Sequence, residues 1–189
     1  MKRNLFLKSC GAFVALATTS IGAFARKYRP GKGIVVKAGK ARNDKPMSLF
    51  EGDTFLTKVG TKDSDGDIYV FESTRVKEGG PSYHLHYEQD EYWFVLKGEF
   101  LFKVGDEEFT AKEGDSVFGP RMIPHAFSKL GEGEAKLLMF FQPAGKMEDL
   151  FQQISEGKLK NLTEEERAKI NHEHGVKKVG PPLIYQKKW

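Results

Sequence analysis

The chain has 189 residues, enough for one domain with a sizeable core and short extensions. Its formal net charge is +4, but residues 1–25 hold three basic residues and no acid, so the charge falls to +1 without them. The basic balance therefore gives no support for nucleic-acid binding, which we exclude. Cys10 is the only cysteine and lies in the same segment, which excludes disulfide and thiolate chemistry from the rest of the chain.

Residues 1–25 have the pattern of a secretory signal peptide. A basic start precedes a mostly apolar run of small residues, which ends in Ala23-Phe24-Ala25, the A-x-A form of a cleavage site. We expect cleavage near Ala25 and export of the mature protein to the periplasm or the medium. An uncleaved membrane anchor is the weaker alternative, because Lys8 and the small residues make a poor span. After cleavage we expect no stable membrane span.

The segment 26–48 is rich in Gly, Lys, Arg and Pro and predicts an N-terminal lead-in along the surface, with one short strand at 33–38. Residues 49–76 predict two strands around a turn at 63–67. The turn has a superficial similarity to a calcium-binding loop, but its glycine is misplaced and Thr74 stands where a bidentate glutamate belongs. A polar hairpin turn is the better interpretation.

Short β-strands separated by turns are expected from residue 83 to residue 142. The predicted strands are residues 92–96, 100–104, 108–111, 116–118, 126–130 and 135–142. In the second of these, Phe100, Phe102 and Val104 occupy alternate positions, as in a half-buried strand. Many short strands at close turn spacing indicate a mainly β fold, an antiparallel sandwich or barrel, over residues 49–143.

The pattern becomes helical after Pro143, and residues 144–189 predict a C-terminal helical extension packed on the barrel. Apolar residues three and four apart predict an amphipathic helix over residues 146–157. A second helix is expected from Thr163, where a capping box begins, to Gly175. The tail that follows is too apolar to be loose, and we expect it to pack on the outside of the barrel.

A histidine pair, His84 and His86, lies in a segment predicted to be a strand. Residues i and i+2 of a strand point to the same face, so the two imidazoles converge. Glu91 follows a short turn, and antiparallel pairing can bring it opposite them. Two histidines and one carboxylate suit a divalent first-row metal: iron, manganese, nickel, cobalt, copper or zinc. His172 and His174 are two apart on a helix, do not share a face and are expected to be solvated.

An H-x-H pair alone is better explained as two polar residues on a surface strand, but a second block at 114–127 changes this interpretation. Together the two blocks resemble the motifs of the cupin superfamily. The matching positions of the first motif are Gly79, His84, His86, Glu91 and Gly98, and those of the second are Gly114, Pro120, Met122, His125 and Lys129. Gly79 is one residue closer to His84 than usual, while Met122 and Lys129 replace a glycine and an asparagine that are not ligands.

The resemblance covers about residues 50–143 and implies an antiparallel double-stranded β-helix, the jelly-roll or cupin barrel. It also implies a single site for one divalent transition metal (Fe, Mn, Ni, Cu or Zn), whose ligands would be His84, His86, Glu91 and His125. Such a shell leaves open coordination positions, and Glu91 is the candidate catalytic base. The helical tail is similar to that of single-domain cupins of the cupin 2 type labelled quercetin dioxygenase-like. Such cupins tend to dimerise, so we expect a homodimer.

Five residues are candidates for binding a small-molecule substrate because of their strand phase or their place beside the histidines: Tyr83, Trp93, Phe127, Phe140 and Gln142. Trp93 and Phe127 are in phase with the metal ligands of their own strands. Phe140 and Gln142 share a face of the last strand that we expect to point inward. For each aromatic residue, ordinary core packing is the more frequent explanation.

Three functions are compatible with this resemblance. The favoured one is an exported metal-dependent oxidoreductase, dioxygenase-like, that acts on a small aromatic or enol-bearing molecule, because the predicted wall is rich in phenylalanine. The second is a metal-dependent isomerase, lyase or hydrolase on a sugar or small acid, with the metal as Lewis acid. The third is a small-molecule-binding protein without catalysis, since a fold alone does not imply chemistry.

Overall fold

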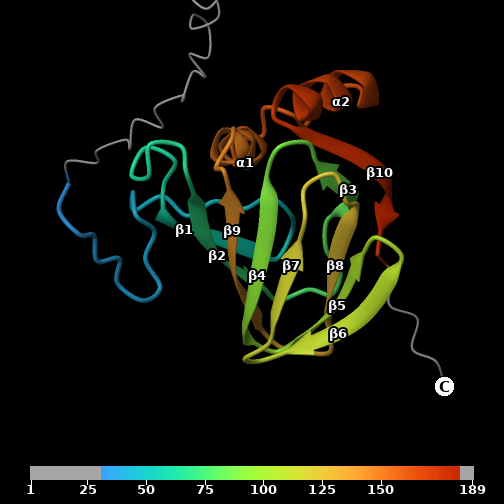
Figure 1. Cartoon of the computed structure of the whole chain (residues 1–189), viewed down its shortest axis with the longest axis horizontal. Coiled ribbons are helices and arrows are strands. Elements are labelled where there is room, and N and C mark those ends of the chain that lie inside the picture. Colours follow the sequence, from blue (N-terminus) through green and yellow to red (C-terminus); the bar gives the residue numbers. More distant parts are fainter. Residues whose placement is uncertain (1–30, 184–189) are drawn as a thin grey trace, which may run out of the picture. The chain divides into compact units, whose positions relative to one another are not determined.

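The computed structural model describes residues 31–183, and the predicted signal peptide lies outside them. Within this part of the chain, two five-stranded antiparallel sheets face each other as a jelly roll (Figure 1). The strands of the first sheet, sheet A, are in order β1 (Asp53–Val59), β2 (Tyr69–Arg75), β9 (Ala135–Gln142), β4 (Asp90–Lys97) and β7 (Ser116–Gly119). Those of sheet B are β10 (Val176–Pro182), β3 (Ser82–His86), β8 (His125–Leu130), β5 (Glu99–Val104) and β6 (Glu107–Lys112). The predicted mainly β, double-stranded β-helix with C-terminal helices is confirmed.

The core lies between the two sheets and follows from the period-two pattern of their central strands. In β2, β4 and β9, buried residues alternate with half-buried or exposed ones. β4 and β9 pair so that Glu91 lies opposite Phe141 and Trp93 opposite Met139. Each large apolar side chain buried in this way stabilises the fold by about 1.5–3 kcal/mol. The register therefore fixes the height at which Glu91 enters the barrel.

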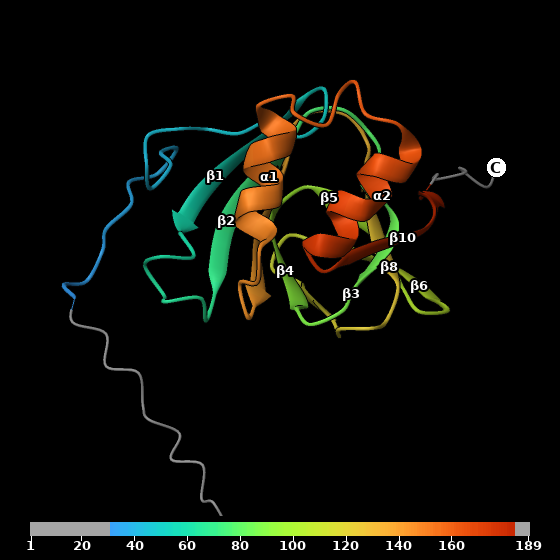
Figure 2. The ribbon, with the colours of Figure 1, turned by 90° about the horizontal axis from the view of Figure 1, so that it is seen from above.

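Two helices follow the last barrel strand, and Figure 2 shows α1 (Met147–Ser155) over β1 and β2 and α2 (Glu164–Glu173) near β10. Helix α1 buries Met147 and Leu150. Helix α2 begins with the predicted capping box: Glu166 N donates to the Thr163 hydroxyl at 3.2 Å, and Thr163 N donates to the Glu166 carboxylate at 2.8 Å. No residue of α2 is buried, so its position depends on its cap and on neighbouring side chains.

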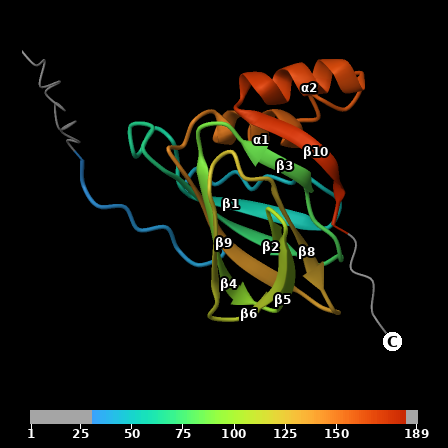
Figure 3. The ribbon, with the colours of Figure 1, turned by 45° about the vertical axis from the view of Figure 1, so that its right-hand side comes forward.

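The C-terminal tail forms β10, which the sequence analysis did not predict. On one edge, β3 pairs with β8, with His84 opposite His125. The backbone groups on its other edge need a second partner. β10 supplies it, with Val176 opposite His86 and Lys178 opposite His84, and Figure 3 shows the two strands side by side. The tail therefore extends the sheet that carries the histidines.

The predicted strand at 33–38 is wrong, since this segment has no regular structure. Ile34 and Val35 are exposed, and the edge of β1 is met instead by Met47, which bridges to Phe55. Among residues 31–183, no helix is both long and apolar enough to cross a membrane.

The polar turn between β1 and β2 is held by its own side chains. Asp63 accepts hydrogen bonds from Gly60 N at 3.0 Å and from the Arg42 guanidinium at 3.2 Å. The Ser64 hydroxyl donates to the Ile68 carbonyl at 2.6 Å and accepts from Ile68 N at 3.0 Å. These local bonds support the interpretation as a hairpin turn.

Candidate metal centre

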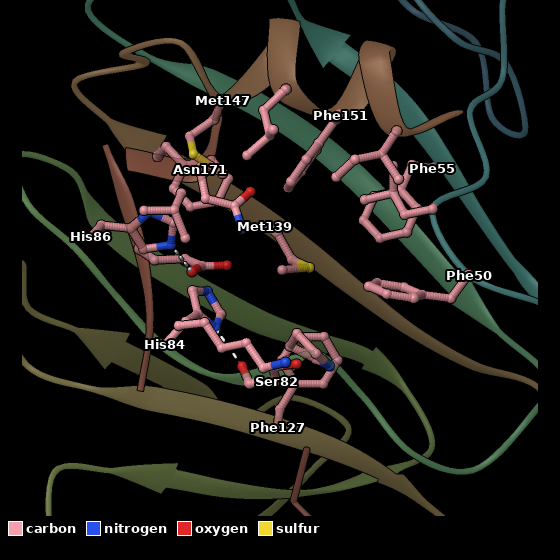
Figure 4. Close-up of a pocket in the computed structure, with 18 of the residues that line it drawn as sticks. Phe50, Phe55, Ser82, His84, His86, Phe127, Met139, Met147, Phe151 and Asn171 are labelled. Carbon is pink, nitrogen blue, oxygen red and sulfur yellow. Dashed lines mark hydrogen bonds and ion pairs between the residues drawn. The ribbon is translucent and has the colours of Figure 1, made fainter. Parts of the chain in front are cut away.

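Four side chains from three strands converge between the sheets. His84 and His86 come from β3, His125 from β8 and Glu91 from β4 of the facing sheet, and one ligand atom from each lies within 4.8 Å of the others. His84 is partly open, and the other three are buried. In Figure 4, the rings of His84 and His86 occupy one side of a cavity. The structure thus brings together the set that the sequence predicts.

Backbone carbonyls orient two of the imidazoles. Nδ1 of His84 donates to the Ser82 carbonyl at 2.7 Å, and Nδ1 of His125 donates to the Ile123 carbonyl at 3.0 Å. Because a carbonyl only accepts, Nδ1 carries the proton in both rings. In the neutral rings, each Nε2 therefore presents a lone pair, which is how a second partner prepares a histidine to bind a metal.

The contacts within the cluster fit a cation among the four side chains. Nε2 of His125 and Nε2 of His86 each lie 3.1 Å from Oε2 of Glu91. For His125 this sets a lone pair against a carboxylate oxygen, and two acceptors repel unless a proton or a metal lies between them. Nδ1 of His86 is buried with no hydrogen-bond partner, so no backbone group competes for this ring. Three imidazoles and one carboxylate are a donor set for a divalent first-row metal.

The protonation states favour metal binding at neutral pH. Burial, with His86 and His125 nearby, lowers the pKa of His84 to about 3. Burial likewise lowers the pKa of His86. Burial would raise the pKa of Glu91, but the imidazoles of His125 and His86 beside its Oε2 outweigh this and hold the pKa below its usual range. His84 and His86 are thus neutral imidazoles and Glu91 an ionised carboxylate, the forms that a metal needs.

A cavity of about 170 Å³ adjoins the cluster (Figure 4). Its apolar wall includes Phe50, Phe55, Phe127, Met139, Phe141, Met147, Leu150 and Phe151. Its polar lining consists of Arg75, Ser82, Asn171 and Lys178 together with the ligands His84, His86 and Glu91. Figure 4 shows Phe50 and Phe55 on the side opposite the histidines, so a bound molecule would lie between the cluster and an aromatic wall.

Of the five predicted substrate-binding residues, Phe127 lines this cavity. Trp93 is inward and buried but supports the site from behind, with its ring 5.2 Å from that of His125 in an edge-to-face contact. Tyr83 does not line the cavity, because its hydroxyl donates to the Gly105 carbonyl at 2.7 Å. It alternates with His84 in β3 and so occupies the opposite face.

The expected inward face of β9 is wrong. Phe140 lies on the face that points away from the core, where its ring stacks on that of Tyr92 with the ring centres 4.6 Å apart. Gln142 is exposed. The buried positions are the alternate set, among which Met139 and Phe141 line the cavity. The expected face holds Lys136 and Gln142 as well as Leu138 and Phe140, whereas the buried face is apolar throughout, so composition already favoured the buried face. The position of Phe141 opposite Glu91 decides it.

His174 also differs from expectation, since it is buried and links the two helices. Its Nε2 lies 2.9 Å from Asp149 Oδ2, and its Nδ1 donates to the Ile170 carbonyl at 2.7 Å. His172 is exposed, as predicted, with its ring 5.3 Å from that of Tyr87.

Sequence reasoning also missed Arg75, which the cavity brings into the site.

These features define a jelly-roll protein with a three-histidine, one-glutamate site that could hold a metal. Residues 70–141 match the family model described as Cupin domain, so this part of the barrel is similar to a cupin domain. Met122, which stands where the cupin motif has a glycine, has a φ of 65°, a region that favours glycine.

The chain is similar to several known proteins. An uncharacterised protein of Methanocaldococcus jannaschii is 32% identical over 66 residues, which are 35% of this chain and 53% of that protein. The chain thus spans about half the length of the curated relative it matches. KdgF from Halomonas sp. aligns with a TM-score of 0.46 and 17% identity, covering 52% of this chain and 86% of its own. A predicted oxalate decarboxylase from Thermotoga maritima has a TM-score of 0.47 and 15% identity, covering 52% and 90%.

Proposed function

We propose that the chain is an exported metal-dependent oxidoreductase of the dioxygenase type that acts on a small aromatic or enol-bearing molecule. The observation that carries this proposal is the junction of the His84, His86, Glu91 and His125 cluster with an aromatic-walled cavity of about 170 Å³. The four side chains would hold one divalent metal, which when bound supplies a redox centre with open coordination positions.

The cavity selects substrates by size and polarity. An apolar cavity of about 150 Å³ in another protein takes up benzene, so a cavity of about 170 Å³ suits a molecule with one ring. Phe127, Phe141 and Phe151 offer ring faces and edges for contact with it. The same apolar wall disfavours water beside the reacting group.

Glu91 can also move a proton. Its Oε2 is occupied by the two histidine contacts, whereas its Oε1 makes no hydrogen bond within residues 31–183. Glu91 lines the cavity, so Oε1 is available to accept a proton from an acidic hydroxyl or C–H group of the substrate. Its lowered pKa keeps the carboxylate ionised at neutral pH, so Oε1 carries no proton.

Export and dimerisation are part of the proposal. The A-x-A pattern that ends at Ala25 supports export, and the tendency of single-domain cupins to dimerise supports a homodimer. Light scattering of residues 26–189 should give about twice the mass of one chain, and a single-chain mass would contradict the dimer.

Oxygen uptake by residues 26–189 tests the chemistry. The protein is loaded separately with Fe(II), Mn(II), Ni(II), Cu(II) or Zn(II) and given single-ring catechols and enols, with a three-ring flavonol as the size control. We expect uptake with a redox-active metal and a single-ring compound, loss of uptake in His84→Ala, and no change in His172→Ala, which alters an exposed histidine. Turnover in the zinc form without oxygen would instead indicate an isomerase or lyase, and binding without turnover would indicate a binding protein.

A further inference from the structure

A buried arginine of the cavity wall has donors without acceptors. Arg75 is 5% exposed and lines the cavity, and its Nε is buried with no hydrogen-bond partner. Its one ion pair within residues 31–183 is with Asp53, and the 3.7 Å between Nη1 and Oδ2 is too long for a hydrogen bond. A guanidinium has five N–H donors, so an acceptor is missing beside Arg75.

Asp53 makes no hydrogen bond to Arg75, and its oxygens accept instead from its own loop. Oδ1 accepts from Leu49 N at 2.9 Å and from the Ser48 hydroxyl at 3.1 Å. Phe50 N donates to both oxygens, at 3.1 Å to each. Asp53 thus caps its own loop and gives Arg75 only a nearby negative charge. Leaving charged donors unpaired in a protein interior is costly, which points to a ligand as the partner.

Aromatic rings hold the guanidinium in place. Its Cζ lies 5.6 Å from the ring centre of Phe127 and 5.9 Å from that of Phe50. Such contacts fix the plane of the guanidinium without using its N–H groups. Phe50, Phe127 and Arg75 all line the cavity, so the guanidinium lies in its wall between two of its rings.

Arg75 is the cation of the cavity lining that still has donors for an anion. Arg75 and Lys178 are its cationic groups, and Glu91, its one acid, belongs to the metal cluster. Lys178 is exposed and pairs with Glu164 at 3.1 Å, whereas Arg75 has no such hydrogen-bonded partner. Burial lowers the pKa of Arg75, yet a guanidinium stays charged in proteins. A planar carboxylate matches the arginine fork with two parallel hydrogen bonds.

We propose that Arg75 binds the carboxylate of the substrate, so that the substrate is a small aromatic acid whose ring lies between Arg75 and the metal cluster. This inference rests on the proposed function, because it takes the cavity beside the cluster as the substrate site. Arg75 is then the residue that sets specificity for acids over neutral compounds of the same shape.

Binding of benzoate, compared with its neutral analogue benzamide, tests the inference by calorimetry. Both metal-loaded and chelator-treated protein are used, because a carboxylate can also bind a metal. We expect benzoate to bind at least about 10-fold more tightly than benzamide in both forms. Arg75→Met should weaken benzoate binding about 10- to 100-fold and leave benzamide within about 3-fold, with Arg75→Lys between. Arg42→Met is the matched control, since Arg42 is exposed.

Equal affinity of the wild-type protein for benzoate and benzamide would overturn the inference even if Arg75→Met failed to fold. A benzoate preference that disappears with the metal and survives in Arg75→Met or Arg75→Lys would place the carboxylate on the metal instead. Tighter binding of phenyl phosphate than of benzoate would also contradict it. Because these measurements record binding, they stand even if the oxygen-uptake assay fails, and the two proposals are tested separately.

Discussion

Gly119 of β7 lies opposite Glu91 and directly behind His125, where even one methyl group has no room. In Gly119→Ala, the new Cβ would lie 2.6 Å from Cη2 of Trp93, 2.7 Å from its Cζ3 and 3.2 Å from Nδ1 of His125. The φ of Gly119 is not in the left-handed region, so the effect is steric. The Trp93 ring must move by close to an ångström, and it is fixed between Phe102 and His125.

Overpacking of this kind costs about 1–3 kcal/mol, which for a chain of this size lowers Tm by roughly 2–12 °C. The displacement of the Trp93 ring should also weaken metal binding by at least about 10-fold, because His125 moves with Trp93. Thermal unfolding and metal titration measure the two effects. Gly33→Ala is the control, because nothing lies within 4 Å of its Cβ position. If Gly119→Ala behaves like Gly33→Ala in both assays, the assigned packing behind His125 is wrong.

Three further predictions follow from the site and the termini. In metal-free protein, the pKa values of His84 and His86 are lowered from 6.5 and that of Glu91 from 4.5. The unfolded chain therefore binds more protons than the folded one, so the free energy of unfolding decreases as the pH is lowered below about 6.5. His84 alone gives a loss of about 2 kcal/mol between pH 7 and pH 5 in urea unfolding, and a constant stability would contradict the burial of the imidazoles. Met122→Gly should raise the free energy of unfolding by about 1 kcal/mol, because the φ of 65° strains a side-chain-bearing residue, and a loss of stability would show that the methionine side chain matters more. A fusion of the full chain to a reporter active only outside the cytoplasm should be active, and deletion of residues 2–25 should abolish that activity. A deletion variant as active as the full chain would rule out the signal peptide.

The resemblance to the cupin motifs implies all four ligands, and strand periodicity alone supports only the histidine pair. His84 and His86 share a face by their i, i+2 spacing, and the capping box that begins at Thr163 needs only four consecutive residues. These are local rules, and the structure agrees with both. What depends on one strand alone could therefore be predicted.

The remaining features depend on contacts between distant elements. The tail that forms β10 carries Lys177, Lys178 and two prolines, so no apolar alternation marks it as a strand. It is ordered by the free edge of β3. Phe140 and Gln142 were misplaced because Leu138 and Phe140 give the outer face of β9 an apolar centre, and the pairing with β4 shows which face is inward. Arg75 resembles an ordinary strand end until the cavity is known.

The central claim is that His84, His86, Glu91 and His125 hold one metal ion. Plasma mass spectrometry of residues 26–189, purified without chelator or metal-affinity resin, measures it most directly, with His84→Ala/His125→Ala as the test variant and His172→Ala as the control. We predict about one divalent transition metal per chain in the wild type and the control and almost none in a folded double variant. A wild type that holds no metal even after reconstitution, or a double variant that holds as much as the wild type, would contradict the claim.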